Sequence, residues 1–434
     1  MHWGHAVSRD LVHWQHLPIA LYPDEQGMIF SGSAIVDVDN TAGFGMNALI
    51  VIFTYHKEHR ESQNLAYSTD DGRTWTKNAG NPILPADDAL PDFRDPKVFW
   101  HEDHWVMCLA AGQQILFYVS PDLKNWEQSG SFGAGFGSRD GVWETPDLFE
   151  LPIENSDETR WVLTTGVGNG AVAGGSGTQY FIGHFDGRTF ASEHSPETVL
   201  WMDHGADFYA PQSWNNEPNG RRLLLAWMTN WQYAMFTPAS SWRGAFSLIR
   251  ELSLRTDGNK TCLFQRPTPE MQKLRIEHFH WSDKMIIPNT NLLADLRGDS
   301  VEILAEFKLI EDVDRFGFCL RVGGDQRTTI FYEVKQNKLC VDRTRSGLID
   351  FHKAFASIHS ASLHPINGLL RLQIFMDKSS VEVFANDGLL TFTESIFPAE
   401  QSHGFELFVE GGNVLLHWLD VFNLKPAQFQ TAEN

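Results

Sequence analysis

Two carboxylic acids of this chain stand in sequence settings that favour acid–base chemistry. Glu144 lies between Trp143 and the turn-forming Thr145-Pro146, with apolar or small residues on either side. Partial desolvation beside an indole and a proline disfavours the charged form of a carboxyl, so we expect the pKa of Glu144 to be raised. A carboxyl that stays protonated near neutral pH can act as a general acid.

The second acid, Asp95, lies 49 residues upstream of Glu144, between Arg94 and Pro96 at the start of an apolar run. The adjacent guanidinium favours the ionised form of Asp95, so we expect one protonated and one charged carboxyl. Taken alone, a Trp-Glu-x-Pro stretch is also typical of a glutamate that caps a turn at the rim of a protein. The pair together favours a site that protonates a substrate beside a fixed negative charge.

The composition limits the class of partner. Lys and Arg total 34 against 55 Asp and Glu, a formal net charge of −21, which repels nucleic acid and anionic membranes and suits a neutral ligand. No apolar run reaches the roughly 18 residues of a transmembrane helix. The chain is long enough for two domains at 434 residues. Its 15 tryptophans are either core residues or flat surfaces on which sugars stack.

The sequence predicts neither a metal site nor a cofactor. The histidines at 2–16 and 101–104 lack the cysteine or carboxylate help and the tetrahedral convergence that a metal needs. No Gly-rich phosphate loop follows a strand and opens a helix, and the Gly-rich stretch 166–177 is expected to be a loop. Four cysteines lie in apolar runs and are expected to be reduced core residues: Cys108, Cys262, Cys319 and Cys340.

Short strand-like runs separated by turn signals recur along the chain, which predicts an all-β fold. A weak repeat organises the first half: Ser8 to Trp14, Ser68 to Trp75 and Ser120 to Trp126 share a Ser-x-Asp turn followed by Trp, and Phe185 to Phe190 is a degraded copy. The Ser residues are spaced by 60 and 52 positions. Such a period, with about four strands per unit, is typical of β-propeller blades. We expect each Asp to close a turn and each Trp or Phe to pack between units.

The pattern of strand-like runs and turn signals changes near residue 266. We predict a propeller domain over 1–265, a linker over 266–295 with a short helix at 271–277, and a C-terminal domain over 296–434. The last segment shows about nine alternating strands with hairpin signals, which indicates a β-sandwich. It is expected to be a packing module, with carbohydrate binding as the alternative.

Seven short motifs are spread over the chain: Met1-His2-Trp3-Gly4-His5-Ala6, Phe30-Ser31-Gly32-Ser33-Ala34, Phe93-Arg94-Asp95-Pro96, Trp143-Glu144-Thr145-Pro146-Asp147, Trp227-Met228-Thr229-Asn230-Trp231-Gln232-Tyr233, Trp242-Arg243-Gly244-Ala245-Phe246-Ser247 and Asp377-Lys378-Ser379-Ser380-Val381-Glu382-Val383-Phe384. Together these motifs resemble those of the β-fructosidases of glycoside hydrolase family 32, the group of invertases, exo-inulinases and levanases. The similarity covers essentially the whole chain, and the motifs follow the family order.

The resemblance implies a five-bladed propeller followed by a β-sandwich, and retaining hydrolysis of terminal β-fructofuranosides of sucrose, inulin or levan through a fructosyl-enzyme. It assigns the acid/base role to Glu144. Asp95, beside Arg94, would hold fructose hydroxyls and stabilise the transition state without attacking. Further residues are expected at the pocket: Trp3, Phe30, Ser31 and Trp231 as lining, and Asp207 and Tyr209 either at its rim or in structural hydrogen bonds.

The sequence also departs from the family pattern. Family members carry an Asn-Asp-Pro-Asn-type motif before the His-Trp-Gly-His segment, and its Asp is the nucleophile. No such motif occurs here, and Thr145 stands where many relatives have Cys. We therefore expect an N-terminally truncated enzyme whose first blade is incomplete and which is nearly inactive as written. Its compartment stays open, because a signal peptide would be lost with such a segment.

Two alternatives remain. A non-catalytic fructose- or fructan-binding propeller would keep Arg94, Asp95 and the tryptophans without turnover. A fructosyltransferase would share the site and differ in the loops that bind the acceptor.

Overall fold

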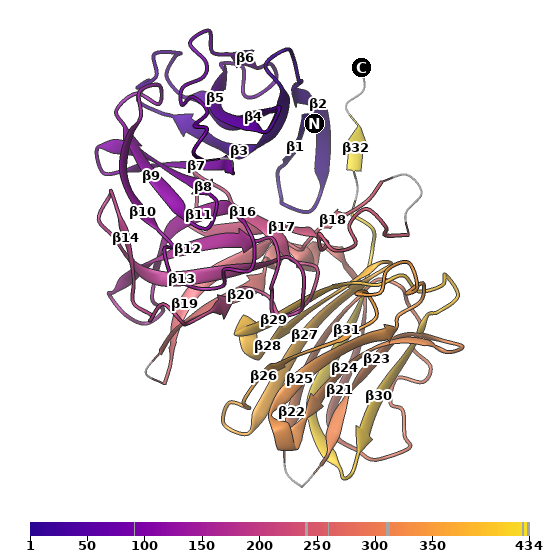
Figure 1. The fold of residues 1–434 in the computed structure, drawn as a ribbon. Helices are drawn as coiled ribbons and strands as arrows, with labels where there is room; N and C mark the ends of the chain where they lie inside the picture. Colours follow the sequence, from indigo (N-terminus) through magenta and orange to yellow (C-terminus); the bar gives the residue numbers. More distant parts are fainter. Residues whose placement is uncertain (91, 239–241, 259, 310–312, 428, 432–434) are drawn as a thin grey trace.

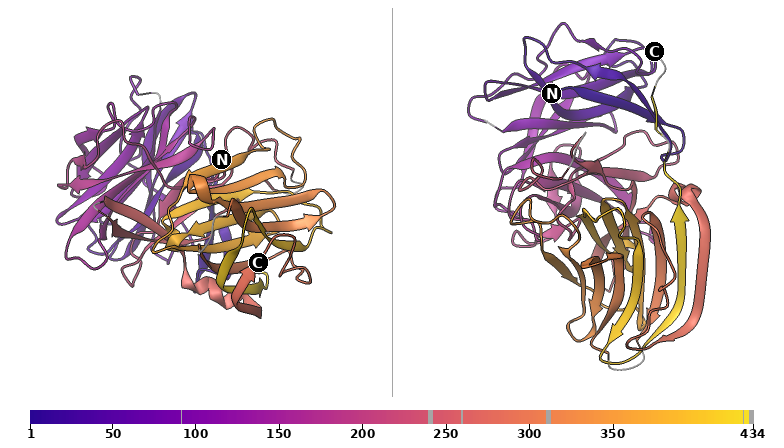
Figure 2. Two further views of the ribbon diagram at one scale, coloured as in Figure 1. Left: turned by 90° about the horizontal axis from the view of Figure 1, so that it is seen from below. Right: turned by 90° about the vertical axis from the view of Figure 1, so that its right-hand side faces the viewer.

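The computed structural model describes residues 1–90, 92–238, 242–258, 260–309, 313–427 and 429–431. Within these residues the chain is all-β, with short 3₁₀ turns (η) as its helical elements. As Figures 1 and 2 show, the indigo-to-pink sheets form one body and the orange-to-yellow strands a second body beside it. None of the described helices is long and apolar enough to cross a bilayer.

Within the described residues, the first body contains five sheets whose strands, β32 excepted, pair antiparallel. Their strands are β1 (Trp3–Ser8) and β2 (Trp14–Leu21); β3 (Met28–Asp37), β4 (Ala48–Lys57), β5 (Arg60–Ser68) and β6 (Thr76–Lys77); β7 (Phe93–His101), β8 (His104–Ala111), β9 (Ile115–Ser120) and β10 (Glu127–Phe132); β11 (Trp143–Pro152), β12 (Thr159–Val167), β13 (Gly177–Phe185), β14 (Phe190–Ser192) and β15 (Leu200–Trp201); and β16 (Tyr209–Ser213), β17 (Arg222–Met228), β18 (Ala245–Phe246), β19 (Arg250–Asp257) and β20 (Lys260–Pro267). The predicted loop at 166–177 joins β12 to β13.

The C-terminal end of the described chain returns to the first sheet. Strand β32 (Phe429–Thr431) pairs in parallel with β2, Trp14 opposite Phe429, and lies apart from the rest of the second body (Figure 1).

The second body is a two-sheet sandwich, as the sequence predicted. One sheet has the strand order β21 (Arg275–Ile286), β31 (Val414–Leu424), β22 (Val301–Lys308), β27 (Leu369–Asp377), β28 (Ser380–Ala385) and β29 (Leu390–Ser395). The other has the order β26 (Ile358–Ser362), β25 (Lys338–Arg345), β24 (Gln326–Glu333), β23 (Arg315–Gly323) and β30 (Gly404–Glu410). The remaining elements are η1 (Pro269–Leu274), η2 (Val334–Gln336) and η3 (Asn386–Gly388).

The hydrophobic cores follow this architecture. One apolar cluster fills the space between the two sandwich sheets, and four others lie between successive sheets of the first body. Trp14 of the first sheet stacks on Trp214, which follows β16 of the fifth, at 6.5 Å between ring centroids. Sheets that pack face to face in succession, with the first beside the last, have the arrangement of a β-propeller.

The repeat predicted from Ser-x-Asp and Trp is confirmed in its turns. Asp10 accepts hydrogen bonds from the backbone of Val12 and His13, and Asp122 from that of Lys124 and Asn125. Asp70 and Asp186 make the equivalent contacts. Each repeat tryptophan donates its indole N–H to the carbonyl three residues earlier, at 3.0 to 3.2 Å. The motif therefore closes the outer hairpin of four sheets.

Two local predictions differ from the structure. The short helix expected at 271–277 is the 3₁₀ turn η1, which ends at Leu274, and residues 275–277 already belong to β21. Residues 275–286, inside the segment predicted as linker, form an edge strand of the sandwich. Alternate side chains explain this, because Phe279 and Trp281 pack on the sandwich core whereas their neighbours face solvent. The four cysteines are free thiols, Cys262 half-buried and the others buried.

The two bodies meet through buried ion pairs. Arg250 of β19 bonds Glu382 of β28 at 3.0 Å, and Asp207 accepts from Arg343 of β25 at 2.6 Å. All four side chains are almost fully buried. Charges withdrawn from water require such partners, so these contacts fix the relative position of the two bodies.

Candidate active site

Three neighbouring sheets begin with the same local structure. The first strands β7, β11 and β16 contain Arg94-Asp95-Pro96, Glu144-Thr145-Pro146 and Tyr209-Ala210-Pro211, and at each triplet two residues face one on the next strand. The middle residues have φ values of 64°, 49° and 51°. Proline has no N–H for a strand ladder, so it is tolerated where a bulge interrupts the pairing.

The bulges line one cavity. Asp95, Thr145 and Ala210, the middle residues of the three triplets, form its wall, and Trp3, Ser31, Gly32 and Gln212 complete the lining. The cavity has a volume of about 230 Å³. Its lining comes from all five sheets of the first body. A hollow of this size, walled by small polar groups and one indole, accommodates a single sugar ring.

The residues that precede the bulges contact one another. Arg94 donates to Glu144 Oε1 from Nη2 at 2.9 Å and from Nε at 3.1 Å. The hydroxyl of Tyr209 donates a short hydrogen bond to Glu144 Oε2. Both oxygens of Glu144 are thus held by donors from the sheets on either side. The Glu144 side chain remains about one-fifth exposed.

Asp95 is tied to the Glu144 strand through the backbone. Its Oδ2 accepts the N–H of Thr145 at 2.9 Å, and its own N–H donates to Thr54 Oγ1 at 3.1 Å. The carboxyl is buried, with 7 % of the residue exposed. Of the two acids singled out in the sequence, Asp95 therefore lines the hollow, and Glu144 directly precedes the lining residue Thr145.

Further residues surround Arg94 that the sequence analysis missed. Glu61 of β5 accepts from Arg94 Nη1 at 3.1 Å, and Asp92 accepts from the same nitrogen at 2.9 Å. His56 lies 3.2 Å from Glu61 and stacks on Phe30, with ring centroids 4.4 Å apart. Glu61 comes from another sheet, and its sequence surroundings carry no motif. By contrast, Pro96, Pro146 and Pro211 each stand two residues after one of the contacting side chains Arg94, Glu144 and Tyr209.

The electrostatics of Asp95 differ from the expectation. Burial, with the neighbouring charge of Glu144, raises the pKa of Asp95 to about 7, against the opposing effects of the Thr145 N–H and of Arg94. The prediction that Arg94 keeps Asp95 fully ionised was wrong, because the guanidinium is shared with Asp92, Glu61 and Glu144. Burial alone would lower the pKa of Arg94, but these acids raise it, so Arg94 remains a cation.

The other predicted pocket residues occupy distinct places. Trp3 and Ser31 line the cavity, and Trp3 donates its indole N–H to the carbonyl of Phe30 at 2.8 Å. Trp231 is half-exposed beside Tyr209, with ring centroids 6.5 Å apart. Asp207 lies elsewhere: its carboxylate is fully buried and bonded to Arg343 and to Tyr233. These contacts are those of the structural alternative that the sequence left open.

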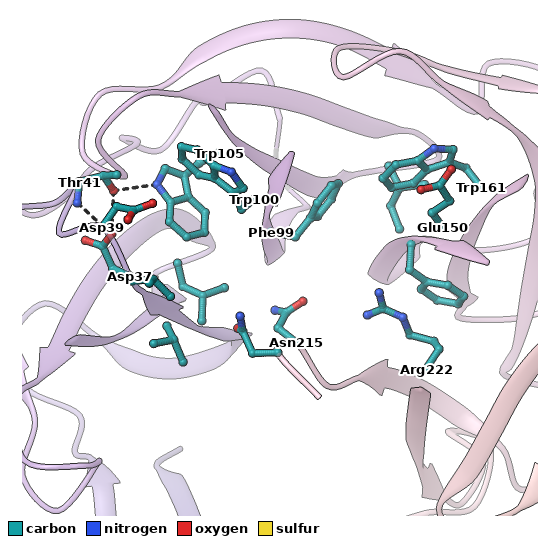
Figure 3. A pocket seen from close by; sticks show the side chains of 16 residues that line it. Asp37, Asp39, Thr41, Phe99, Trp100, Trp105, Glu150, Trp161, Asn215 and Arg222 are labelled. Atoms are coloured by element: carbon teal, nitrogen blue, oxygen red, sulfur yellow. Dashed lines mark hydrogen bonds between the residues drawn. The ribbon is translucent and has the colours of Figure 1, made fainter. Parts of the chain in front are cut away.

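A larger cavity of about 400 Å³ lies at the other end of the same first strands (Figure 3). Trp100, Trp105 and Trp161 line it together with Asp37 and Arg222. The carboxylate of Asp37 already accepts from Thr41 and from the backbone of Ala42 at 2.8 to 3.0 Å. Asp95 lines the smaller cavity, and Glu144, bonded to Arg94 and Tyr209, directly precedes its lining residue Thr145, so we assign the candidate active site there.

Among the described residues, one group of three side chains has the arrangement of metal ligands: His278, His280 and Asp420. It lies on β21 and β31 of the sandwich, away from the histidines considered in the sequence.

Comparisons with known proteins agree with this geometry. A family model described as the glycosyl hydrolases family 32 N-terminal domain matches residues 1–267, and one described as the glycosyl hydrolases family 32 C terminal matches residues 270–423. A levanase of Bacillus subtilis is 49% identical over 98% of this chain, and a levanase of Bacillus sp. strain L7 is 39% identical over 98%. The chain spans 64% of the length of the first and 48% of the second.

Solved structures show the same fold. The exo-inulinase of Aspergillus awamori superposes with a TM-score of 0.91 at 33% identity, covering 98% of this chain and 90% of that one. A fructofuranosidase of Schwanniomyces occidentalis in complex with fructose gives a TM-score of 0.90 at 30% identity, covering 98% and 89%.

Proposed function

The chain belongs to glycoside hydrolase family 32, and we propose that it acts on terminal β-D-fructofuranosyl groups of sucrose or fructans, with Glu144 as the acid/base of a retaining hydrolysis. The observation that carries the proposal is the position of Glu144. Its carboxylate is held by Arg94 and Tyr209 beside a sugar-sized cavity walled by Asp95. The similarity to levanases and to a fructose-bound fructofuranosidase supports a fructoside as the substrate.

Each side chain has a part in this proposal. Glu144 protonates the glycosidic oxygen as the leaving group departs. Asp95 accepts hydrogen bonds from fructose hydroxyls, and above pH 7, where it is mostly ionised, its negative charge favours the oxocarbenium-like transition state. Arg94 orients Glu144 and balances the acids around it. Trp3, Phe30, Ser31 and Trp231 surround the sugar, and Trp231 offers a stacking face at the mouth.

The nucleophile of the retaining reaction is inferred from the resemblance to the family. A retaining reaction needs a second carboxylate about 5–5.5 Å from the acid/base. The family places it in an Asn-Asp-Pro-Asn-type motif, which does not occur in these 434 residues. We propose that turnover requires that aspartate, whereas fructoside binding does not.

The sheets of the first body can be assigned to individual propeller blades. We propose that the five sheets of the first body are the five blades, because each contributes to the lining of the central cavity and successive sheets share cores. The first of them has three strands among the described residues, β1, β2 and β32, whereas the others have four or five. We also propose that the boundary between the two domains lies within the segment predicted as linker, 266–295, at the 3₁₀ turn η1, because β20 before it belongs to the first body and β21 after it to the sandwich.

Calorimetry and a reducing-sugar assay test the function together. We expect fructose to bind the 434-residue chain, Asp95→Asn to weaken binding by at least tenfold, and Glu144→Gln to leave it within about threefold. In a protein that also carries the Asn-Asp-Pro-Asn aspartate, Glu144→Gln should lower release of fructose from levan, inulin or sucrose by about 10²–10⁴.

Three results would contradict the proposal. Binding without release even in the protein with the aspartate favours the sugar-binding propeller. Oligosaccharide products at high sucrose indicate a fructosyltransferase. Unchanged hydrolysis in Glu144→Gln excludes the acid/base assignment.

A further inference from the structure

The outer pair of strands in the six-stranded sandwich sheet carries an imidazole-rich cluster on its solvent face. His278 and His280 are separated by one residue on β21, so their side chains project from the same face. Asp420 of β31 lies directly opposite His280 in the antiparallel register. Phe279, between the two histidines, points the other way and packs on the core. The backbone alone therefore gathers the three side chains.

The contacts within the cluster are close. His278 Nε2 and His280 Nδ1 each lie 2.7 Å from the same oxygen, Asp420 Oδ1. One ligand atom from each of the three residues can be chosen so that all lie within 4.8 Å of one another. The histidines are about half-exposed and Asp420 about one-quarter exposed, so a hydrated ion can reach them.

Neighbouring groups hold the cluster in place. The ring of His278 stacks on Phe422, with centroids 4.3 Å apart and an interplanar angle of 9°. The guanidinium of Arg275 lies 4.1 Å from the centre of the same Phe422 ring and is itself bonded to Glu302.

We propose that His278, His280 and Asp420 form a surface site for a divalent transition-metal ion such as Zn²⁺ or Ni²⁺. Two imidazoles with one carboxylate are ligands that these ions prefer, whereas Ca²⁺ and Mg²⁺ prefer sites made of oxygens. The two nitrogens bind through their lone pairs, so any proton they carry leaves to solvent when the ion enters. Water completes the coordination.

The site has a structural consequence. Strand β21 is the edge of its sheet, and a shared ion would tie it to β31. An ion that binds the native chain but not the unfolded chain stabilises the native state. When its free concentration is 100 times the dissociation constant, the unfolding equilibrium shifts about 100-fold toward the native state. The site lies in the sandwich, apart from the cavity at Glu144, so the proposal stands or falls independently of the proposed enzyme activity.

Titration of the untagged chain with NiCl₂ and with ZnSO₄ by calorimetry tests the proposal. We expect one ion per chain, at least tenfold weaker binding in His278→Ala and in His280→Ala, and no binding at this stoichiometry in the double variant. His417→Ala is the matched control: His417 lies on β31, is half-exposed and bonds an acid, Glu306, but belongs to no such group. It should bind like the parent.

A second measurement separates binding from folding defects. The melting temperature should rise with ZnSO₄ and fall back with a chelator in the parent and in His417→Ala, and should not respond in the double variant. The site is refuted if the parent binds neither ion, or if the double variant binds as the parent does.

Discussion

Arg94 and Glu144, joined at 2.9 Å, occupy the same position in two successive sheets, each directly before a bulge. Tyr209 holds this position in the third sheet and bonds the other oxygen of Glu144. The acid is thus fixed from both sides by residues that the fold makes equivalent.

Tyr209→Phe removes a charge-assisted hydrogen bond from Glu144 and leaves the ring in place. Such bonds contribute about 1.5–3 kcal/mol, so in a protein that also carries the Asn-Asp-Pro-Asn aspartate we expect kcat to fall by roughly 10- to 100-fold. Fructose affinity should stay within about threefold, because the hydroxyl contacts the acid. Steady-state kinetics and calorimetry check the two quantities separately. Tyr67→Phe, in a ring stack with Phe44 in the second sheet, is the control and should leave both unchanged. Equal losses in both variants would argue against a positioning role.

Asp95 should make the stability depend on pH. Its folded-state pKa of about 7 lies above the ordinary 3.8, so the native chain binds more protons than the unfolded chain between these values. The free energy of unfolding therefore falls as pH rises from about 4 to 7, by as much as roughly 4 kcal/mol from this group. Asp95→Asn lacks the titration. Urea unfolding of both proteins at pH 4, 6 and 8 measures the difference, and a difference that is independent of pH would contradict the assignment.

Arg343→Met should destabilise the junction of the two bodies strongly. It leaves Asp207 and Glu394, both fully buried, without their cation, a change that costs about 3–5 kcal/mol. Arg315→Met is the matched control, since its pair with Glu410 at 2.8 Å is exposed and should contribute no more than about 1 kcal/mol. Denaturant unfolding compares the two. Similar midpoint shifts would mean that the buried network does not hold the junction.

Trp231→Ala should weaken fructan binding by about 3- to 10-fold, because stacking on an aromatic face contributes about 0.5–1.5 kcal/mol. Trp231 is 51% exposed, so the fold should tolerate the change. Trp100→Ala, 42% exposed at the larger cavity of Figure 3, is the control. Affinity electrophoresis in gels that contain levan or inulin measures both. Retardation lost in Trp100→Ala instead would move the binding site to the other end of the first strands.

Local patterns in the sequence predicted much of the fold. The Ser-x-Asp turns and their tryptophans form through contacts within a few residues, so their spacing alone indicated the repeated sheets. Alternation of apolar residues likewise predicted strands such as Val414–Val421. The first strands β7, β11 and β16 were harder, because proline and positive φ break the alternation at the residues that matter most.

The features that sequence could not supply depend on contacts between sheets. Glu61 reaches Arg94 from a different sheet, and the burial that raises the pKa of Asp95 exists only in the assembled ring. The adjacent Arg94 therefore led to the wrong prediction for Asp95, that its ionised form is favoured, whereas its pKa is raised. The structural role of Asp207 could not be predicted from the sequence either, because its partner Arg343 lies 136 residues away in the other body.

The bulges let the side chains that line the cavity change without a change in the strand pairing of the sheets. At Thr145 and Ala210 the backbone is already turned out of its ladder, so a new side chain there would alter the hollow without changing any inter-strand bond. Evolution, or a designer, can thus vary the shape and polarity around a bound sugar one sheet at a time, while the hairpins behind remain as they are.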